Sequence, residues 1–381
     1  MCLISIVVPT KNRYSYLKYL IKLIDNFRLS ELELVIQDNS DNNAEILQFL
    51  KNFDNKQIKY FYSSDKLSMS ENADKAVSHS RGEYVCMIGD DDGVCRNIVN
   101  CVHWMKENNI DALRTNNTSY VWPDALDNGR SKTNAILLYK KPSNNYKIVD
   151  VEKSRAKTLK SGCQHITLLP ALYNCIVKKS VLESVYSIGS TFFPGPSPDM
   201  SNAVSNSFFT KKFVMSDMPV VISGSSVMTG GGVFNKTRGK GILPLKDVPF
   251  INQHHIDNWE CDFPKVWVGR LVWPESAVKA LKYCHRQDLV KTLDRNRMYA
   301  LTMLYYPSMK EICFSYAPNK VLFLKDFLNA LIKNGTRVLK NKMVSILIPS
   351  YSFGRISHKN VKSIIEAEEI LFSVTKELKF E

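Results

Sequence analysis

Three consecutive carboxylates, Asp90, Asp91 and Asp92, directly follow the mostly apolar run EYVCMIG at residues 83–89. Two like charges a few ångströms apart repel by about 4 kcal/mol at an effective dielectric of about 20, so some feature of the fold must offset this repulsion. A solvated turn would do so, because Asp-Gly is common turn chemistry. A cation site would also do so, because divalent ions take oxygen ligands and bridge carboxylates to substrate phosphates.

The residues before this aspartate triplet alternate between two periodicities. Short β-branched runs predict strands at residues 3–9, 31–37, 58–63 and 83–89. Apolar residues spaced by three and four positions predict amphipathic helices at residues 14–27, 44–53 and 71–80. Strands that alternate with helices are typical of βαβ units, so we expect a mainly parallel sheet covered by helices on both faces.

Polar clusters follow three of the predicted strands. The segment PTKNR (9–13) follows the first strand, Asp38 follows the second and the triplet follows the fourth. Ligands of open α/β sheets bind beyond the carboxyl ends of the strands, so these clusters should meet at one edge. Asp38 could accept an N–H from a nucleobase there, or form an Asx turn within DNSD. The triplet could hold a ribose hydroxyl and a divalent metal.

Three segments resemble family 2 glycosyltransferases of the GT-A fold: SIVVPTKNR (5–13), ELVIQDNSD (33–41) and ENADKAVSHSRGEYVCMIGDDDG (71–93). The resemblance covers roughly residues 3–115 and is weak afterwards. It implies an α/β protein with a GT-A (Rossmann-like), mainly parallel sheet flanked by helices. We expect a nucleotide-sugar-binding catalytic domain over residues 1–250 and a mostly helical C-terminal region over 251–381.

The resemblance also implies roles for individual residues. The nucleotide-binding positions of the family correspond here to Pro9, Thr10, Arg13, Asp38, Asp90 and Asp91. Among them, Asp38 matches the carboxylate that reads uracil and Asp90 the residue that contacts the ribose. Asp91 matches the metal-binding position for Mn²⁺ or Mg²⁺. Because Gly89 stands where the family commonly has Asp, both Asp91 and Asp92 remain candidate metal ligands.

An inverting transfer by one in-line displacement needs a general base on the face opposite the leaving group. The resemblance implies an acidic residue near the start of a helix beyond the metal loop. The segment FFPGPSPDMSNAVSNSFFTKKF (192–213) offers Asp199, which a Pro/Gly-rich loop delivers to the first turn of a predicted helix. The alternative is that Asp199 is only a helix N-terminal carboxylate.

Two further segments carry candidate residues. The segment GSSVMTGGGVFNKTRGKG (224–241) combines glycines with Lys236 and Arg238, which could close over the diphosphate as a lid or belong to an ordinary flexible basic loop. The pair His254-His255 could add a metal ligand, although a histidine pair in a polar connector is more often solvated.

Composition limits the function class. The chain has 381 residues, 44% of them hydrophobic, and a formal net charge of +14, which favours anionic partners. No apolar run approaches the ~18 residues of a transmembrane helix, and the N-terminus lacks the basic start of a signal peptide. The nine cysteines show no metal-ligand spacing and are expected to be reduced, which favours a cytoplasmic protein.

The C-terminal third is expected to be helical over 275–306 and 319–335, followed by further basic residues. Lys333, Arg337, Lys340 and Lys342 could seat the protein peripherally on an anionic membrane at the inner face of the plasma membrane. Packing on the catalytic domain, or at a dimer interface, is the alternative.

These observations together predict a metal-dependent inverting glycosyltransferase with a nucleotide-diphosphate sugar donor, UDP-linked by preference. The acceptor would be a glycan or lipid-linked glycan in O-antigen or capsular polysaccharide biosynthesis. A sugar-nucleotide nucleotidyltransferase is the alternative, but VVPTKNR lacks its Gly-x-Gly-Thr-Arg type of start. A nucleic-acid-binding protein is disfavoured because the basic residues are dispersed and no recognition motif is found, so no nucleic-acid partner is expected.

Overall fold

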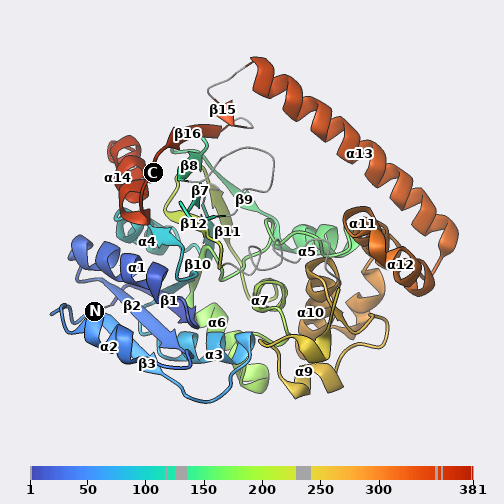
Figure 1. Ribbon diagram of the computed structural model, residues 1–381, viewed down its shortest axis with the longest axis horizontal. Helices are drawn as coiled ribbons and strands as arrows, with labels where there is room; N and C mark the ends of the chain where they lie inside the picture. Colours follow the sequence, from blue (N-terminus) through green and yellow to red (C-terminus); the bar gives the residue numbers. More distant parts are fainter. Residues whose placement is uncertain are drawn as a thin grey trace.

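An eight-stranded sheet in the order β3-β2-β1-β4-β10-β6-β11-β9 forms the centre of the computed structural model (Figure 1). The structure describes residues 2–115, 118–125, 135–228, 242–347, 351–352, 355–378 and 380. The first half of this sheet is parallel and consists of β3 (Ile58–Tyr62), β2 (Leu32–Asp38), β1 (Ile4–Thr10) and β4 (Tyr84–Met87). The predicted α/β class is confirmed.

Strands β1, β2 and β4 are buried on both faces because helices cover each face, whereas the edge strand β3 is half-buried. In β1, Ile4, Ile6 and Val8 pack into one hydrophobic core, whereas Val7 packs into another on the opposite face. The first core contains residues of α1 (Tyr14–Phe27), α2 (Ala44–Leu50) and α4 (Ile98–Glu107). The second contains residues of α3 (Met69–Ser78) and α6 (Lys179–Gly189).

The second half of the sheet mixes parallel and antiparallel pairs. It consists of β10 (Cys175–Lys178), β6 (Ala112–Arg114), β11 (Phe213–Ser216) and β9 (Tyr146–Val149), which leads into α5 (Val151–Lys160). The strand β10 is antiparallel to both β4 and β6, and β11 is parallel to β6. The carboxyl ends of β1, β2, β4, β6 and β11 therefore lie at one edge of the sheet.

A second sheet of six strands, in the order β15-β16-β8-β7-β12-β5, joins segments from distant parts of the chain. Its strands are β5 (Gly93–Val94), β7 (Thr118–Val121), β8 (Ile136–Tyr139), β12 (Val221–Ser225), β15 (Tyr351–Ser352) and β16 (Arg355–Lys359). A small two-stranded sheet pairs β13 (Leu243–Pro244) with β14 (Val266–Trp267). Because β5 directly follows the triplet, the second sheet packs beside the carboxyl end of β4.

Helices from the second half of the chain share a separate hydrophobic core (Figure 1). They are α7 (Pro198–Asn206), α9 (Gln253–Asp257), α10 (Gly269–Tyr283), α11 (Arg295–Tyr305), α12 (Lys310–Tyr316) and α13 (Lys320–Leu347). Short 3₁₀ turns lie at Leu245–Asp247, Gln287–Thr292 and Pro307–Met309. The chain is therefore not helical throughout 275–306: α10 ends at Tyr283, and His285 adopts a left-handed φ of 56°, which an α-helix cannot continue.

The last helix, α14 (Ile364–Thr375), packs against α1 and β5 at the N-terminal half of the chain. The buried Glu368 accepts hydrogen bonds from the side chain of Arg96 at 3.0 and 2.6 Å. A Cβ at Gly93 would lie 2.7 Å from Ile364, so this strand needs glycine for the close approach. Residues 355–375 thus belong to the N-terminal packing unit, while the division at residue 250 stays a prediction.

All nine cysteines are free thiols, and six of them are buried. None of the helices within the described ranges is long and apolar enough to cross a membrane.

Candidate functional site

The triplet lies in the loop after β4, next to the loop that follows β1. The Thr10 hydroxyl donates to Asp90 Oδ2 at 2.6 Å. The Arg13 guanidinium lies 3.1 Å from Asp90 Oδ1 and 2.9 Å from Asp91 Oδ2. One cation therefore neutralises two of the three carboxylates, which answers how the chain tolerates their proximity in the absence of any ligand.

Asp91 is held through both its carboxylate and its backbone. The Ser226 hydroxyl donates to Asp91 Oδ2 at 2.8 Å, and the indole N–H of Trp122 donates to the Asp91 carbonyl at 2.8 Å. Gly224 packs on the same carbonyl so closely that a Cβ there would lie 1.8 Å from it. Strand β12 therefore requires a glycine at this position to lie against the triplet.

Asp92 is fully buried, and both of its carboxylate oxygens accept hydrogen bonds. The backbone N–H groups of Gly89 and Gly224 donate to it at 2.7 and 2.6 Å. The hydroxyl of Tyr173 donates to it at 2.7 Å. These contacts join the loop after β4 to β12 and to the segment before β10, which is a positioning role.

Burial governs the electrostatics of the triplet. Asp90 and Asp92 are 1% and 0% exposed, and this burial raises the pKa of both carboxyls above the ordinary range. The negative charge of Asp91 raises both pKa values further, whereas Arg13 opposes the rise at Asp90. The site thus stores unbalanced negative charge that an additional cation would relieve.

Asp38 lies at the end of β2, where it pairs with Thr10 of β1 in the strand register. Its side chain is fully buried, and its Oδ2 accepts hydrogen bonds from the hydroxyls of Tyr14 at 2.6 Å and Tyr60 at 2.7 Å. Its Oδ1 accepts the Ser40 N–H at 2.8 Å, which is the Asx-turn contact that the sequence also allowed. Pro9 lies beside Thr10 at the end of β1.

Asp199 occupies the first turn of α7, directly after Pro198 at the helix start, as predicted. Burial raises the pKa of its carboxyl to about 6, and the nearby Arg114 guanidinium opposes this rise. Its charge in turn contributes to raising the pKa of Tyr173, whose hydroxyl bonds to Asp92. Asp199 and the triplet are therefore both close enough to Tyr173 for their charges to act on it.

The remaining candidates divide into two groups. The lid residues Lys236 and Arg238 lie outside the described residues. His254 and His255 lie on α9, where His255 is close enough to Glu71 to feel its charge, and they line a different cavity.

Asp90 and Asp91 are the residues that suit a divalent metal. The described part of the chain contains no group of three or more His, Cys, Asp or Glu side chains that could hold an ion. Mg²⁺ is commonly bound by one or two carboxylates together with substrate phosphates, so two carboxylates are sufficient for this type of site. Asp90 Oδ1 is buried, and its contact in the described structure is the ion pair with Arg13 at 3.1 Å, so a metal ion here would replace one cation with another.

Three residues of the site were missed by the sequence analysis. Tyr173, Gly224 and Ser226 hold the triplet but come from segments that are more than 80 residues away from it. Gly224 and Ser226 begin the segment that was interpreted as a basic lid. Nothing in the local pattern around Tyr173 distinguishes it from a core tyrosine.

Comparison with known proteins bears on the first half of the chain. The family model for glycosyl transferase family 2 matches residues 5–163, which contain Thr10, Arg13, Asp38 and the triplet. Residues 5–163 belong to glycosyl transferase family 2. The family predicted from the three motifs is thereby confirmed. Asp199, Gly224 and Ser226 lie after residue 163, outside the matched range.

A curated relative is the GalNAc(5)-diNAcBac-PP-undecaprenol beta-1,3-glucosyltransferase of Campylobacter jejuni, which is 34% identical to this chain over 92 residues. The alignment covers 23% of this chain and 29% of the relative, so the chain spans less than a third of that protein.

Solved structures with similar folds include S. aureus TarS 1–349 in complex with UDP-GlcNAc, with a TM-score of 0.48 and 14% identity over 85% of this chain and 89% of the other. The mannosyltransferase PcManGT from Pyrobaculum calidifontis, in complex with GDP-Man and Mn²⁺, has a TM-score of 0.39 and 13% identity over 96% of this chain and 86% of the other.

Proposed function

We propose that the chain is a metal-dependent, inverting glycosyltransferase that moves a sugar from a nucleoside-diphosphate donor to an acceptor hydroxyl. The observation that carries this proposal is that Tyr173 is close to both the triplet and Asp199. Its hydroxyl donates to Asp92 at 2.7 Å, and the charge of Asp199 contributes to raising the pKa of Tyr173. A donor site and a base thus share one edge of the sheet.

The donor diphosphate would bind at Arg13, Asp90 and Asp91. The Arg13 guanidinium can turn from the two carboxylates to the phosphate oxygens, because a divalent ion at Asp90 and Asp91 takes over its neutralising role. When bound, such an ion stabilises the negative charge that develops on the leaving diphosphate. We assign Asp91 as the main protein ligand and Asp92 as a positioning residue, because both oxygens of Asp92 are occupied by donors.

Asp199 would act as the general base. Its carboxyl has a pKa raised to about 6 by burial, which is near the range where a base is both ionised and able to take a proton at neutral pH. It would accept the proton of the acceptor hydroxyl as that oxygen attacks the anomeric carbon from the face opposite the diphosphate. A single displacement of this kind inverts the anomeric configuration.

The preference for uridine rests on Asp38. Its Oδ2 is occupied by two tyrosine hydroxyls, but its Oδ1 accepts only the Ser40 N–H and retains a lone pair. That oxygen would accept the N3–H of uracil. Tyr14 and Tyr60 would hold the carboxylate in position for this contact.

The acceptor would be a lipid-linked glycan of O-antigen or capsule type, reached at the inner face of the membrane. The curated relative that acts on an undecaprenol-linked substrate, by its name, supports this choice of acceptor class. Helix α13 supports it independently, because it extends along the edge of the molecule in Figure 1 and packs on α11 through its first turns.

The outer face of α13 is apolar and basic. Apolar residues at helical spacing form a stripe on this face, and each of them is between 43% and 75% exposed. They are Val321, Leu324, Leu328, Leu331, Ile332, Val338 and Leu339. Residues 320–340 contain five basic residues and one acidic residue, Asp326. A basic amphipathic helix binds anionic lipid headgroups by about 1 kcal/mol per cation, whereas identical basic helices would repel one another. We therefore assign this face to an anionic membrane.

The membrane assignment is tested by co-sedimentation with vesicles of phosphatidylglycerol and phosphatidylcholine. Binding should require phosphatidylglycerol and should fall about tenfold in a Leu328→Asp, Leu331→Asp variant, with Tyr186→Asp, an exposed apolar residue on α6, as the control. Equal binding by all three proteins, or a stable dimer that the double variant dissociates, would refute it.

The transfer function is tested by a thermal-shift panel of UDP, GDP, CDP and ADP with and without Mn²⁺. A ligand at 100 times its Kd adds about 2.7 kcal/mol of apparent stability. We expect UDP with Mn²⁺ to give the largest shift. Absence of any nucleotide-dependent shift would refute the donor site, and equal shifts for all four would refute the uracil assignment.

A further inference from the structure

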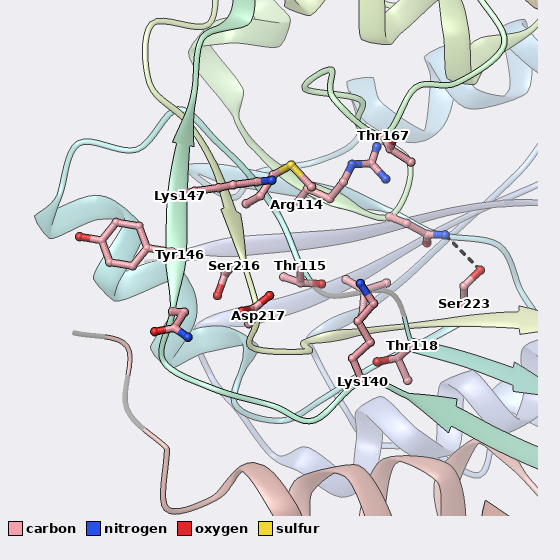
Figure 2. Close-up of a pocket in the computed structure, with 14 residues that line it drawn as sticks. Arg114, Thr115, Thr118, Lys140, Tyr146, Lys147, Thr167, Ser216, Asp217 and Ser223 are labelled. Atoms are coloured by element: carbon pink, nitrogen blue, oxygen red, sulfur yellow. Dashed lines mark hydrogen bonds between the residues drawn. The ribbon is translucent and has the colours of Figure 1, made fainter. Parts of the chain in front are cut away.

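A polar cavity of about 550 Å³ lies beside the proposed donor site, and its lining residues take no part in the proposed donor binding or proton transfer (Figure 2). One wall comes from the ends of β6, β11 and β9 in the large sheet, and the facing wall comes from β7 and β12 in the second sheet. Figure 2 shows Lys147 and Arg114 on one side of this space and Thr118, Lys140 and Ser223 on the other. The cavity therefore lies between the two sheets, at the same edge as the triplet.

The charge of the lining is predominantly positive. Arg114, Lys140 and Lys147 contribute three cations, against the single carboxylate of Asp217. The two lysine side chains are exposed and come from different strands, Lys147 on β9 and Lys140 directly after β8. Cations that converge from separate elements raise the local concentration of an anionic ligand.

Several buried polar atoms of the same cavity lack a partner. Among the described residues, Arg114 Nε, Thr118 Oγ1 and Asn174 Oδ1 are buried and form no hydrogen bond. Thr118 as a whole is 2% exposed. A buried polar atom without a partner is unfavourable, so a ligand that satisfies these atoms would be stabilised here. Arg114 Nε and the Thr118 hydroxyl can donate hydrogen bonds to an oxyanion. Asn174 Oδ1 can accept a hydrogen bond from a hydroxyl group next to that oxyanion.

The cavity is connected to the proposed catalytic residues through consecutive residues of two segments. Tyr173 bonds to Asp92, and the next residue, Asn174, lines the cavity. Gly224 bonds to Asp92, and the preceding residue, Ser223, lines the cavity and accepts a hydrogen bond from Asn174. Arg114 is close enough to Asp199 to lower the pKa of its carboxyl. The cavity is therefore on the side of the base, where the acceptor must bind.

We propose that this cavity binds a phosphoryl group of the acceptor, so that the acceptor is a phosphate-bearing glycan and not a neutral one. The identification of the bound molecule as the acceptor rests on the proposed function. The prediction that a sugar phosphate binds in this cavity does not rest on it. The phosphoryl oxygens accept from Arg114 and Thr118 and are neutralised by Lys140 and Lys147. Asn174 Oδ1 accepts from a hydroxyl of the attached sugar. A phosphate in the glycan chain and the diphosphate of a lipid-linked glycan supply the same chemistry.

The proposal is tested by calorimetric titration of the full-length protein with N-acetylglucosamine 1-phosphate, with N-acetylglucosamine as the neutral match. Saturating UDP and Mn²⁺ occupy the donor site in one arm and are omitted in the other. We expect the sugar phosphate to bind in both arms and the neutral sugar to bind at least about tenfold more weakly. The affinity should fall about tenfold in Lys140→Gln, Lys147→Gln and about threefold or more in Thr118→Val.

Three controls separate the outcomes. Lys51→Gln, at an exposed lysine directly after α2, removes one lysine charge outside the cavity and should leave binding unchanged. The UDP affinity of the Lys140→Gln, Lys147→Gln variant should equal that of the parent, so that failure of this cavity is distinguished from failure of the donor site. Thr118→Val changes no charge and keeps the side-chain shape, which guards against a loss that only reflects misfolding.

The proposal is overturned if the sugar phosphate fails to bind, or binds equally in the parent and the Lys140→Gln, Lys147→Gln variant. It is also overturned if UDP abolishes the binding and Arg13→Gln removes it, because the sugar phosphate then occupies the donor site. If binding follows the prediction, acceptor KM values identify the source. A rise in the variant with an undecaprenyl-diphosphate glycan assigns the lipid diphosphate, and a rise with a soluble phosphoglycan assigns phosphate within the glycan.

Discussion

The Arg13 guanidinium lies 2.9 Å from the Asp91 carboxylate, and its other terminal nitrogen lies 3.1 Å from Asp90. A side chain that follows β1 thus supplies the positive charge that a metal ion would supply at the same carboxylates. Free protein and metal-bound protein are therefore expected to differ in what neutralises the triplet.

The first prediction follows from this exchange. Arg13→Gln leaves two buried carboxylates without a cation and should lower the free energy of unfolding by about 3 kcal/mol. Mn²⁺ together with UDP should restore most of the loss, because the ion replaces the missing charge. Thermal unfolding of parent and variant, with and without Mn²⁺ and UDP, measures both effects. A variant as stable as the parent, or one that Mn²⁺ and UDP do not rescue, would contradict the exchange.

The second prediction concerns Asp199. Asp199→Asn removes the proton acceptor and should lower kcat by about 10²–10⁴-fold while leaving the Kd for UDP unchanged. The matched control is Asp54→Asn, an exposed carboxylate after α2, which should retain kcat within about threefold. Proton NMR of the product should show the inverted anomer. A retained anomer, or normal turnover by Asp199→Asn, would remove Asp199 from the mechanism.

The third prediction is the pH profile. Because burial raises the pKa of Asp199 to about 6, its carboxyl takes up a proton at a higher pH than an ordinary aspartate does. Only the ionised form can act as a base, so kcat/KM should fall about tenfold per pH unit below about pH 6. A profile that stays flat down to pH 5 would be incompatible with this assignment.

The fourth prediction concerns stability and uses a carboxyl outside the site. Glu275 on α10 is fully buried, its nearest cation Lys279 is 3.8 Å away, and burial raises the pKa of its carboxyl to about 8. An acid with a raised folded pKa stabilises most at low pH and loses that stability as the pH rises from about 4.5 to 8. Glu275→Gln should therefore match the parent at pH 5 and exceed it by about 1–3 kcal/mol at pH 8. Urea unfolding at both pH values checks this, and equal stability at pH 8 would contradict it.

The parallel half of the fold was predictable because its signals are local. The run at 3–9 is apolar and β-branched, and β1 occupies Ile4–Thr10; the pattern at 14–27 coincides with α1. Ser68 caps α3, and Glu71 three residues later completes a capping box. Each of these elements is specified by its own residues.

The second sheet was not predictable from local pattern. Strand β12 pairs with β5 and β7, and β16 pairs with β8, across more than 100 residues of chain. Strands of two to five residues carry too few positions for an alternating pattern. The sequence could propose Asp90, Asp91 and Asp199 because each follows a local signal, but not Tyr173, which holds Asp92 through a contact that only the tertiary fold creates.

The fifth prediction tests the central claim, that Asp90 and Asp91 form a metal-dependent nucleotide-diphosphate site. The measurement is calorimetric titration of UDP into the parent, Asp91→Asn and the exposed control Asp41→Asn, each with Mn²⁺ and with a chelator. The account predicts that Mn²⁺ strengthens UDP binding at least about tenfold in the parent and in Asp41→Asn, and that Asp91→Asn abolishes this gain. UDP binding that is independent of Mn²⁺ in the parent, or that keeps its full metal dependence in Asp91→Asn, would contradict the account.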